Sequence, residues 1–156
     1  MQMSDKEKSI TMANEYTLRY RYLKIVVKQF ATFEDNYDST QAVQVNNSVT
    51  FGFSFESSTL LCSEEITYIQ KDKIVLKICV DSHFLIDEES IGNLVSENTF
   101  VCPRPVLCQF ASLNYGSMRG IIFEKTQGSV LNDVILPPYV FDNMITSDLK
   151  FMPQKE

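Results

Sequence analysis

The chain has 156 residues, is 44% hydrophobic by composition and carries a formal net charge of −6. That length can bury one core of its own, and the hydrophobic share is too high for a disordered chain. The acidic balance, without a cluster of Lys and Arg, argues against binding to nucleic-acid phosphates.

The sequence pattern also gives no sign of a membrane or export segment. No apolar run approaches the ~20 residues that span a bilayer, so we expect no insertion into a membrane. Residues 1–16 are polar, lack the apolar centre of an export signal and are expected to be disordered. The four cysteines form no CxxC pair, which is typical of reduced thiols in a cytoplasmic protein.

The first strand and its long connection can be read from residue types. Residues 18–33 are rich in Tyr, Val, Ile and Phe, as strands are. The polar residues 34–48 predict a long connection. Residues 49–55 then alternate apolar with small or polar side chains, which is the period of a half-buried strand.

Two more strands follow at short spacing. They are predicted over 61–70 and 74–81, and each has apolar side chains directed to one face. Lys71 and Asp72 lie between them and predict a tight turn. Short strands in succession favour an antiparallel meander.

Helical patterns appear after residue 86. The acidic residues 87–89 precede a short helix predicted over 90–95, where negative charge suits the positive helix end. Pro103 and Pro105 stand where a longer helix begins. From Val106 onward, a projection at 100° per residue places six residues on one apolar face: Leu107, Phe110, Ala111, Met118, Ile121 and Ile122.

The longer helix contains one buried polar residue and two weak points. Asn114 lies in the middle of the apolar face and needs a hydrogen-bond partner if it is buried. Gly116 and Gly120 weaken the helix, and Gly120 can end it, with Arg119 near the negative helix end, whereas the apolar face allows the helix to continue for a few residues.

The rest of the chain reads as irregular. Residues 121–123 and 130–135 predict irregular or strand-like segments, and 139–145 a short final helix. A polar tail is expected over 147–156. The single domain is therefore placed at 17–146.

Catalytic constellations are hard to assemble from this sequence. His83 is the one histidine, and no metal-binding pair, phosphate-binding loop or nucleophile elbow occurs. Cys79 and His83 are four residues apart in an extended strand, too far for nucleophile activation. We expect no catalytic residues, no metal ligands and no cofactor, and hence no enzyme.

Aromatic side chains are in surplus, with 11 Phe and 7 Tyr. Phe51, Phe53 and Phe55 are expected to pack under the longer helix. Six other residues flank polar loops or the tail: Phe30, Phe33, Tyr37, Tyr139, Phe141 and Met144. Exposed apolar patches are often interfaces, so oligomer contact, client contact and plain core all remain open for these six.

The order of these elements resembles the SecB family of export chaperones. A strand ending in KQFATFE at 28–34 leads through a long connection to three strands, then to a helix opened by CPRP at 102–105. The family's long helix begins near a proline and ends in a Ser-x-x-Arg-Gly-like turn, similar to SMRG at 117–120. The corresponding family-motif residues are Pro103, Ser117, Arg119 and Gly120.

The resemblance implies a fold and a function. The fold would be α+β: a four-stranded antiparallel sheet with a long helix on one face and a short C-terminal helix. SecB proteins assemble as homotetramers (dimers of dimers) and act as holdases without ATP or cofactor, binding unfolded or precursor polypeptides in apolar grooves. The implied client-binding candidates are Phe30, Phe33, Tyr37, Tyr139, Phe141 and Met144.

Departures from the family pattern concern the SecA motor, which binds an acidic face of the SecB sheet. Glu34 keeps one of the expected acids and is the candidate for motor docking. Lys77 stands at the position of another, and Gln29 or Phe30 at a third. Reversed charge weakens docking, so SecA is a doubtful partner.

Two alternatives stay open. Some SecB-like relatives are dedicated chaperones of toxin–antitoxin pairs. A different class is a small-ligand-binding or enzymatic α+β domain in which the aromatic residues line a closed pocket, and Cys79 and His83 would then be the residues to mutate.

Overall fold

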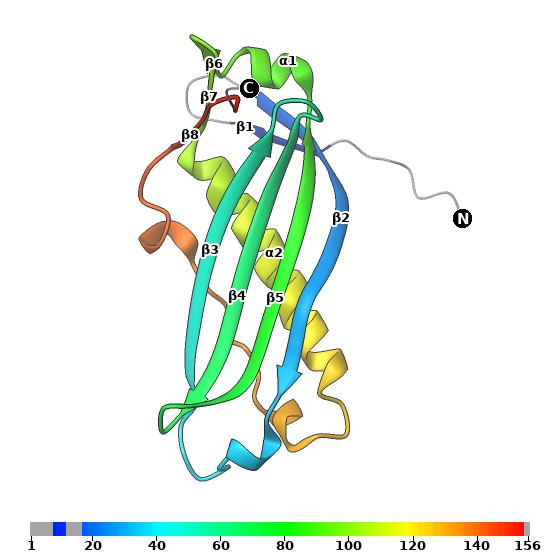
Figure 1. Ribbon diagram of the computed structural model, residues 1–156, viewed down its shortest axis with the longest axis vertical. Helices are drawn as coiled ribbons and strands as arrows, with labels where there is room; N and C mark the ends of the chain where they lie inside the picture. The colour runs from blue at the N-terminus through cyan, green and yellow to red at the C-terminus, as the bar shows by residue number, and fades with distance from the viewer. Residues whose placement is uncertain (1–7, 12–16, 155–156) are drawn as a thin grey trace, which may run out of the picture.

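The computed structural model of the chain describes residues 8–11 and 17–154. Within these residues, five antiparallel strands form a long sheet in the order β1-β2-β5-β4-β3 (Figure 1). They are β1 (Lys8–Thr11), β2 (Thr17–Thr32), β3 (Gln44–Ser54), β4 (Thr59–Gln70) and β5 (Lys73–Ile86). A second, small sheet contains β6 (Val95–Ser96), β7 (Thr99–Cys102) and β8 (Leu149–Phe151).

The described helices are two α-helices and three single turns of 3₁₀ helix. They are α1 (Glu88–Gly92), α2 (Arg104–Lys125), η1 (Glu34–Asn36), η2 (Val130–Asp133) and η3 (Phe141–Asn143). In Figure 1, α2 runs diagonally across one face of the long sheet. None of the helices in the described ranges is long and apolar enough to cross a bilayer.

Strands β3, β4 and β5 form the expected meander. Buried and half-buried residues alternate along all of β4, which places Ile66 and Tyr68 under α2 and Glu65 on the outer face. Lys71 and Asp72 have φ values of 48° and 62°, the left-handed conformations of a two-residue hairpin turn. The predicted tight turn is therefore confirmed.

The sheet has one strand more than predicted, because β1 pairs with the start of β2. Ile10 lies opposite Leu18, within the segment 1–16 that was expected to be disordered. Residues 1–7 and 12–16 of that segment lie outside the described residues. With one apolar residue, Lys8–Thr11 shows no alternation, so its order comes from backbone pairing rather than from its own pattern.

Of the two ends that the sequence allowed for α2, the one at Gly120 is wrong and the continuation of the apolar face is correct. The helix continues to Lys125 and includes residues 121–123, which were expected to be irregular. Ile122 extends the buried face, and that burial outweighs the cost of about 1 kcal/mol for an interior glycine. The chain turns instead at Gly128, whose φ is +78°.

After α2 the chain returns along the helix. Arg119 Nε donates to the Leu136 carbonyl oxygen at 2.9 Å, and Tyr115 Oη donates to the Pro137 carbonyl oxygen at 2.5 Å. Arg119 was expected at the helix end, but it lies in the helix interior and holds the returning segment. The short final helix predicted over 139–145 is one 3₁₀ turn, η3.

The small sheet covers the phenylalanines of β3. The Phe53 ring centroid lies 4.5 Å from that of Phe100 and 5.9 Å from that of Phe151. Phe53 therefore packs under β7 and β8 rather than under α2, as had been expected. Phe151 belongs to the segment predicted as a polar tail, where three residues form β8.

Candidate functional site

Part of β2 is left uncovered on the face where α2 packs. Because opposed residues of an antiparallel pair share a face, Ile25 and Val27 lie on the same side as the buried Ser82 and Val80. Their exposed fractions are nevertheless 46% and 40%, since α2 packs mainly on β4 and β5. Leu23, at the first irregularity of β2, is 47% exposed. We call these three residues the β2 shelf.

The β2 shelf lies between two points at which β2 is attached to α2. At one end the Tyr22 and Ser82 hydroxyls share a hydrogen bond, and Ser82 Oγ donates to Asn114 Oδ1 at 2.5 Å. At the other end Lys125 Nζ lies 5.4 Å from the centroid of the Phe30 ring. The strand is thus fixed at both ends of the shelf.

The first attachment continues into a buried polar cluster. Asn114 Nδ2 donates to the Val80 carbonyl oxygen at 3.1 Å, and Asn114 also bonds the Glu64 carboxyl. The hydrogen-bond partners that the sequence required for Asn114 are therefore present, on two strands of the sheet, β4 and β5. Cys62 Sγ lies 3.8 Å from Glu64 Oε1.

Glu64 is the member of this cluster whose pKa lies nearest to neutral pH. It is 2% exposed, and burial raises the pKa of its carboxyl to about 8, although hydrogen bonds from Asn114 and Cys62 oppose the shift. Glu64 Oε2 has no hydrogen-bond partner among the described residues. At neutral pH this carboxyl is therefore mostly protonated, with Oε2 free to carry the proton.

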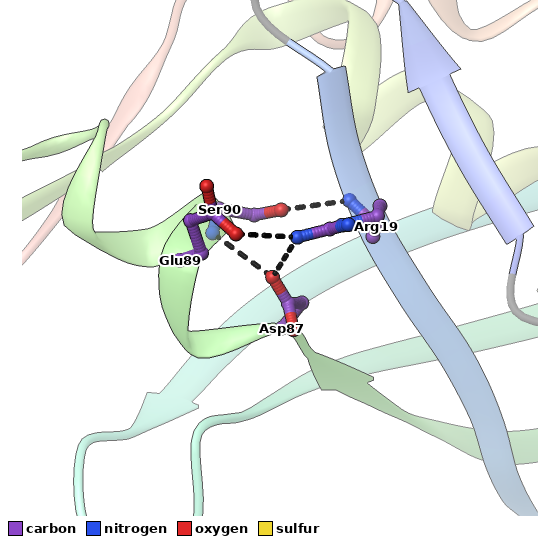
Figure 2. Close-up of polar contacts among 4 residues, drawn as sticks. All are labelled: Arg19, Asp87, Glu89 and Ser90. Atoms are coloured by element: carbon purple, nitrogen blue, oxygen red, sulfur yellow. Dashed lines mark hydrogen bonds and ion pairs between the residues drawn. The ribbon is translucent and has the colours of Figure 1, made fainter.

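A second polar group fixes α1 against the start of β2 (Figure 2). Arg19 Nη2 lies 3.0 Å from Asp87 Oδ2 and 2.8 Å from Glu89 Oε2, and the Arg19 amide donates to Ser90 Oγ. The hydrogen bond to Asp87 is the main cause of the raised pKa of Arg19. Asp87 also caps α1 by accepting from the Ser90 amide, as expected for acids at a helix start.

The first group of predicted client-binding residues follows β2. Phe30 and Tyr37 are half-buried against the core, whereas Phe33 is exposed just after the strand. Glu34, the predicted motor-docking residue, is exposed in the first turn of η1. The long connection thus carries one aromatic residue that is open to a partner.

The second group packs around Tyr115 of α2. The ring centroid of Tyr139 is 4.9 Å from that of Phe141, and both rings lie within 6 Å of the Tyr115 ring. Phe141 is buried and Met144 half-buried, so of these three residues only Tyr139 is exposed, at 39%. Among the described residues η3 packs on α2, whereas Phe30 and Phe33 lie at the end of β2, and no ring contact is found between the two predicted groups.

The family-motif residues occupy ordinary helical positions. Pro103 is the N-cap of α2, as expected for a proline at a helix start. Ser117 Oγ donates to the Leu113 carbonyl oxygen at 3.2 Å, and Gly120 is exposed within the helix. Residues 117–120 are thus helix interior and form no closing turn.

The β2 shelf was missed by sequence reasoning. Ile25 and Val27 belong to a short apolar run between Lys24 and Lys28, a signal of a half-buried strand rather than of an exposed apolar face. Their exposure depends on where α2 crosses the sheet, and no local pattern contains that information.

Cys79 and His83 lie on the outer face of β5. Burial raises the pKa of Cys79, and burial together with Lys24 lowers the pKa of His83. A thiolate–imidazolium pair needs the opposite shifts. The described residues also contain no group of three or more His, Cys, Asp or Glu placed to hold a metal ion.

Comparisons with known proteins add little to this description. No family model matches the chain, and no curated protein matches it. Among solved structures, it is similar to the Mycobacterium tuberculosis Rv1957 SecB-like chaperone, in complex with a ChAD peptide from the Rv1956 HigA1 antitoxin. The identity is 11% and the TM-score 0.44, over 78% of this chain and 85% of that chain. An identity and a TM-score this low do not show which family the chain belongs to.

Proposed function

We propose that this protein is a holdase chaperone, which binds apolar segments of unfolded polypeptides without nucleotide and without chemistry. The observation that carries the proposal is the β2 shelf. Ile25 and Val27 stand 46% and 40% exposed although their partners on β5, Ser82 and Val80, are fully buried, and Leu23 adds a third exposed aliphatic side chain at the irregularity beside them. Apolar surface that a soluble protein leaves uncovered marks a contact site.

The chemistry of the shelf suits clients of many sequences. Aliphatic side chains contribute affinity through buried area, about 25 cal/mol per Å², and demand no particular hydrogen-bond partner. The two attachments to α2 hold the strand in place, so little ordering of the shelf is needed when a client binds. Binding of this kind is tolerant and reversible.

The finer points of the proposal rest on the sequence resemblance. They are a cytoplasmic location, a homotetramer built as a dimer of dimers, and no catalysis. SecA is a weaker candidate as a partner, because Lys77 lies on the outer face beside Glu65, with Nζ 3.7 Å from Oε1. That face is mixed in charge rather than acidic.

The first experiment follows light scattering from a chemically unfolded client diluted with or without the protein and without nucleotide. The double variant Ile25→Thr/Val27→Thr keeps β-branched residues in β2 but removes apolar surface. The matched control, Val130→Thr/Val140→Thr, makes the same kind of change at exposed positions outside the sheet.

The expected result is suppression of scattering by the wild type and the control, and a clear loss of suppression in the shelf variant. Equal activity of all three proteins would contradict the role of the shelf. Binding of one partner encoded beside the gene, without binding of unfolded proteins in general, would indicate a dedicated chaperone, such as one for a toxin–antitoxin pair.

A further inference from the structure

We infer that Glu64 regulates the β2 shelf: its neutral carboxyl keeps Asn114, Ser82 and Tyr22 in their observed arrangement, and its ionisation releases the Tyr22 end. The link to client binding rests on the proposed function of the shelf. The coupling between Glu64 and β2 is a property of the fold and is tested separately.

The coupling follows a chain of hydrogen bonds through four elements. Glu64 on β4 is bonded by Asn114 on α2, and Asn114 Oδ1 accepts from Ser82 Oγ on β5. Because a hydroxyl has one hydrogen to donate, Ser82 must accept from Tyr22 of β2. Every hydrogen bond in this chain therefore has a fixed direction. The chain ends at Tyr22, one residue before the β2 shelf begins at Leu23.

Ionisation of Glu64 would leave a charge without adequate compensation. Oε2 has no described hydrogen-bond partner, and the carboxyl is otherwise met only by the weak thiol donor of Cys62 and by Asn114, whose Nδ2 is shared with the Val80 carbonyl oxygen. The titratable groups around the carboxyl are Cys62 and Tyr68 from β4, Tyr115 from α2 and, through Ser82, Tyr22 from β2. None of these described groups is a cation, and β3 contributes Val49 opposite Glu64.

The nearest group that can stabilise the ionised carboxylate by donating hydrogen bonds is the Asn114 amide. Turning its N–H groups towards the carboxylate withdraws Oδ1 from Ser82 and Nδ2 from the Val80 carbonyl oxygen. Ser82 then loses its acceptor and Tyr22 its fixed partner. Since Phe30 still lies beneath Lys125, the strand is freed at the Tyr22 end alone.

Cys62 and Tyr68, the other ionisable groups on the buried face of β4, titrate above the pH range of interest. Burial raises the pKa of the Cys62 thiol well above its usual range and that of Tyr68 to about 12. The pKa of His83, on the outer face, is lowered from 6.5. A transition between pH 7 and 9 is therefore assigned to Glu64.

The experiment measures amide hydrogen exchange of β2 and α2, and affinity for an unfolded client, from pH 6.5 to 9 in the full chain. The variant is Glu64→Gln, which keeps a neutral side chain of the same size. The control is Glu65→Gln, the adjacent acid on the outer face of β4. After correction for intrinsic exchange, opening that requires ionisation rises up to about tenfold per pH unit below the pKa of Glu64.

We expect this extra exchange around Tyr22 in the wild type and in Glu65→Gln, with a matching change in client affinity, and its absence in Glu64→Gln. The variant Tyr22→Phe should exchange rapidly around the shelf at every pH, because its last link is missing. Identical pH responses in wild type and Glu64→Gln would overturn the inference. If exchange follows Glu64 but client affinity does not, the coupling stands and the shelf is not the client-binding surface.

Discussion

At the scale of single residues, the buried polar cluster is the costly part of this core. A carboxyl that is 2% exposed must stay protonated or find partners, and Glu64 has a hydrogen-bond partner at one oxygen alone among the described residues. Asn114, by contrast, uses both its oxygen and its nitrogen. These two residues therefore make opposite contributions to stability.

Glu64→Gln should stabilise the protein, and more so as pH rises. The folded pKa of about 8 lies above the unfolded value of 4.5, so the folded state binds more protons between these values and the wild type loses stability as pH rises through them. At about 1.4 kcal/mol per pH unit, the variant gains on the order of 3 kcal/mol at pH 7. Urea unfolding from pH 5 to 9 measures this, and a constant difference between the two proteins would contradict it.

Asn114→Ala should destabilise the protein by about 2–4 kcal/mol. The change leaves Ser82 Oγ without its acceptor and the Val80 carbonyl oxygen without this donor, in a fully buried site. Ser112→Ala, on the exposed side of the same helix, serves as the control and should change stability by less than about 0.5 kcal/mol. Similar urea midpoints for the two variants would show that the hydrogen bonds of Asn114 do not contribute to the free energy of unfolding.

At the scale of elements, two glycines near the end of α2 have opposite roles. Gly120 is helical and exposed, and a Cβ there would meet no atom within 4 Å, whereas Gly128 has a φ of +78°. Gly120→Ala should therefore raise the free energy of unfolding by about 0.5–1 kcal/mol, and Gly128→Ala should lower it by about 1 kcal/mol. Thermal unfolding compares the two, and destabilisation by Gly120→Ala would place the helix end back at residue 120.

The start of α1 allows a similar comparison of a cap with an ion pair. Asp87→Ala removes the side chain that accepts from the Ser90 amide and should cost about 1 kcal/mol. Asp87→Asn keeps an acceptor for the cap but weakens the pair with Arg19, which is partly exposed and hence of small value (Figure 2). Asparagine should therefore retain most of the stability in thermal unfolding. Equal losses in both variants would show that the ion pair, not the cap, matters.

Elements with a strong local period were predictable from the sequence, and elements without one were not. The alternation of β4 and the apolar face from Leu107 to Met118 determine those elements almost alone. The hairpin of β6 and β7 turns at Glu97 and Asn98, without the glycine that marks such turns. Its short strands depend on pairing with each other and with β8.

The candidate site was less predictable than the fold for a related reason. The aromatic residues chosen from the sequence differ widely in exposure, with Phe141 buried and Phe33 47% exposed. Burial of an aromatic residue depends on which segment returns over it. The residues that stay uncovered, such as Ile25, become visible only when the crossing of α2 is known.

At the scale of the whole molecule, the net charge of −6 should influence which clients are held. Electrostatic attraction between the acidic chain and a basic unfolded client falls with salt, whereas apolar burial does not. Raising NaCl from about 0.05 to 0.5 M should therefore weaken capture of a basic client more than that of an acidic client. Titration calorimetry at both salt concentrations tests this, and identical salt responses would exclude a part for net charge.

The strand order also sets a sequence of events during synthesis. β2 is made early, but its neighbour β5 is complete only at Ile86, and α2 later still. At roughly 5–20 residues per second, β2 waits several seconds with only β1 available to pair with it. During that interval, Leu23, Ile25 and Val27 belong to an extended, apolar nascent segment. Until β5 arrives, the protein is itself a client of the kind that it is proposed to hold.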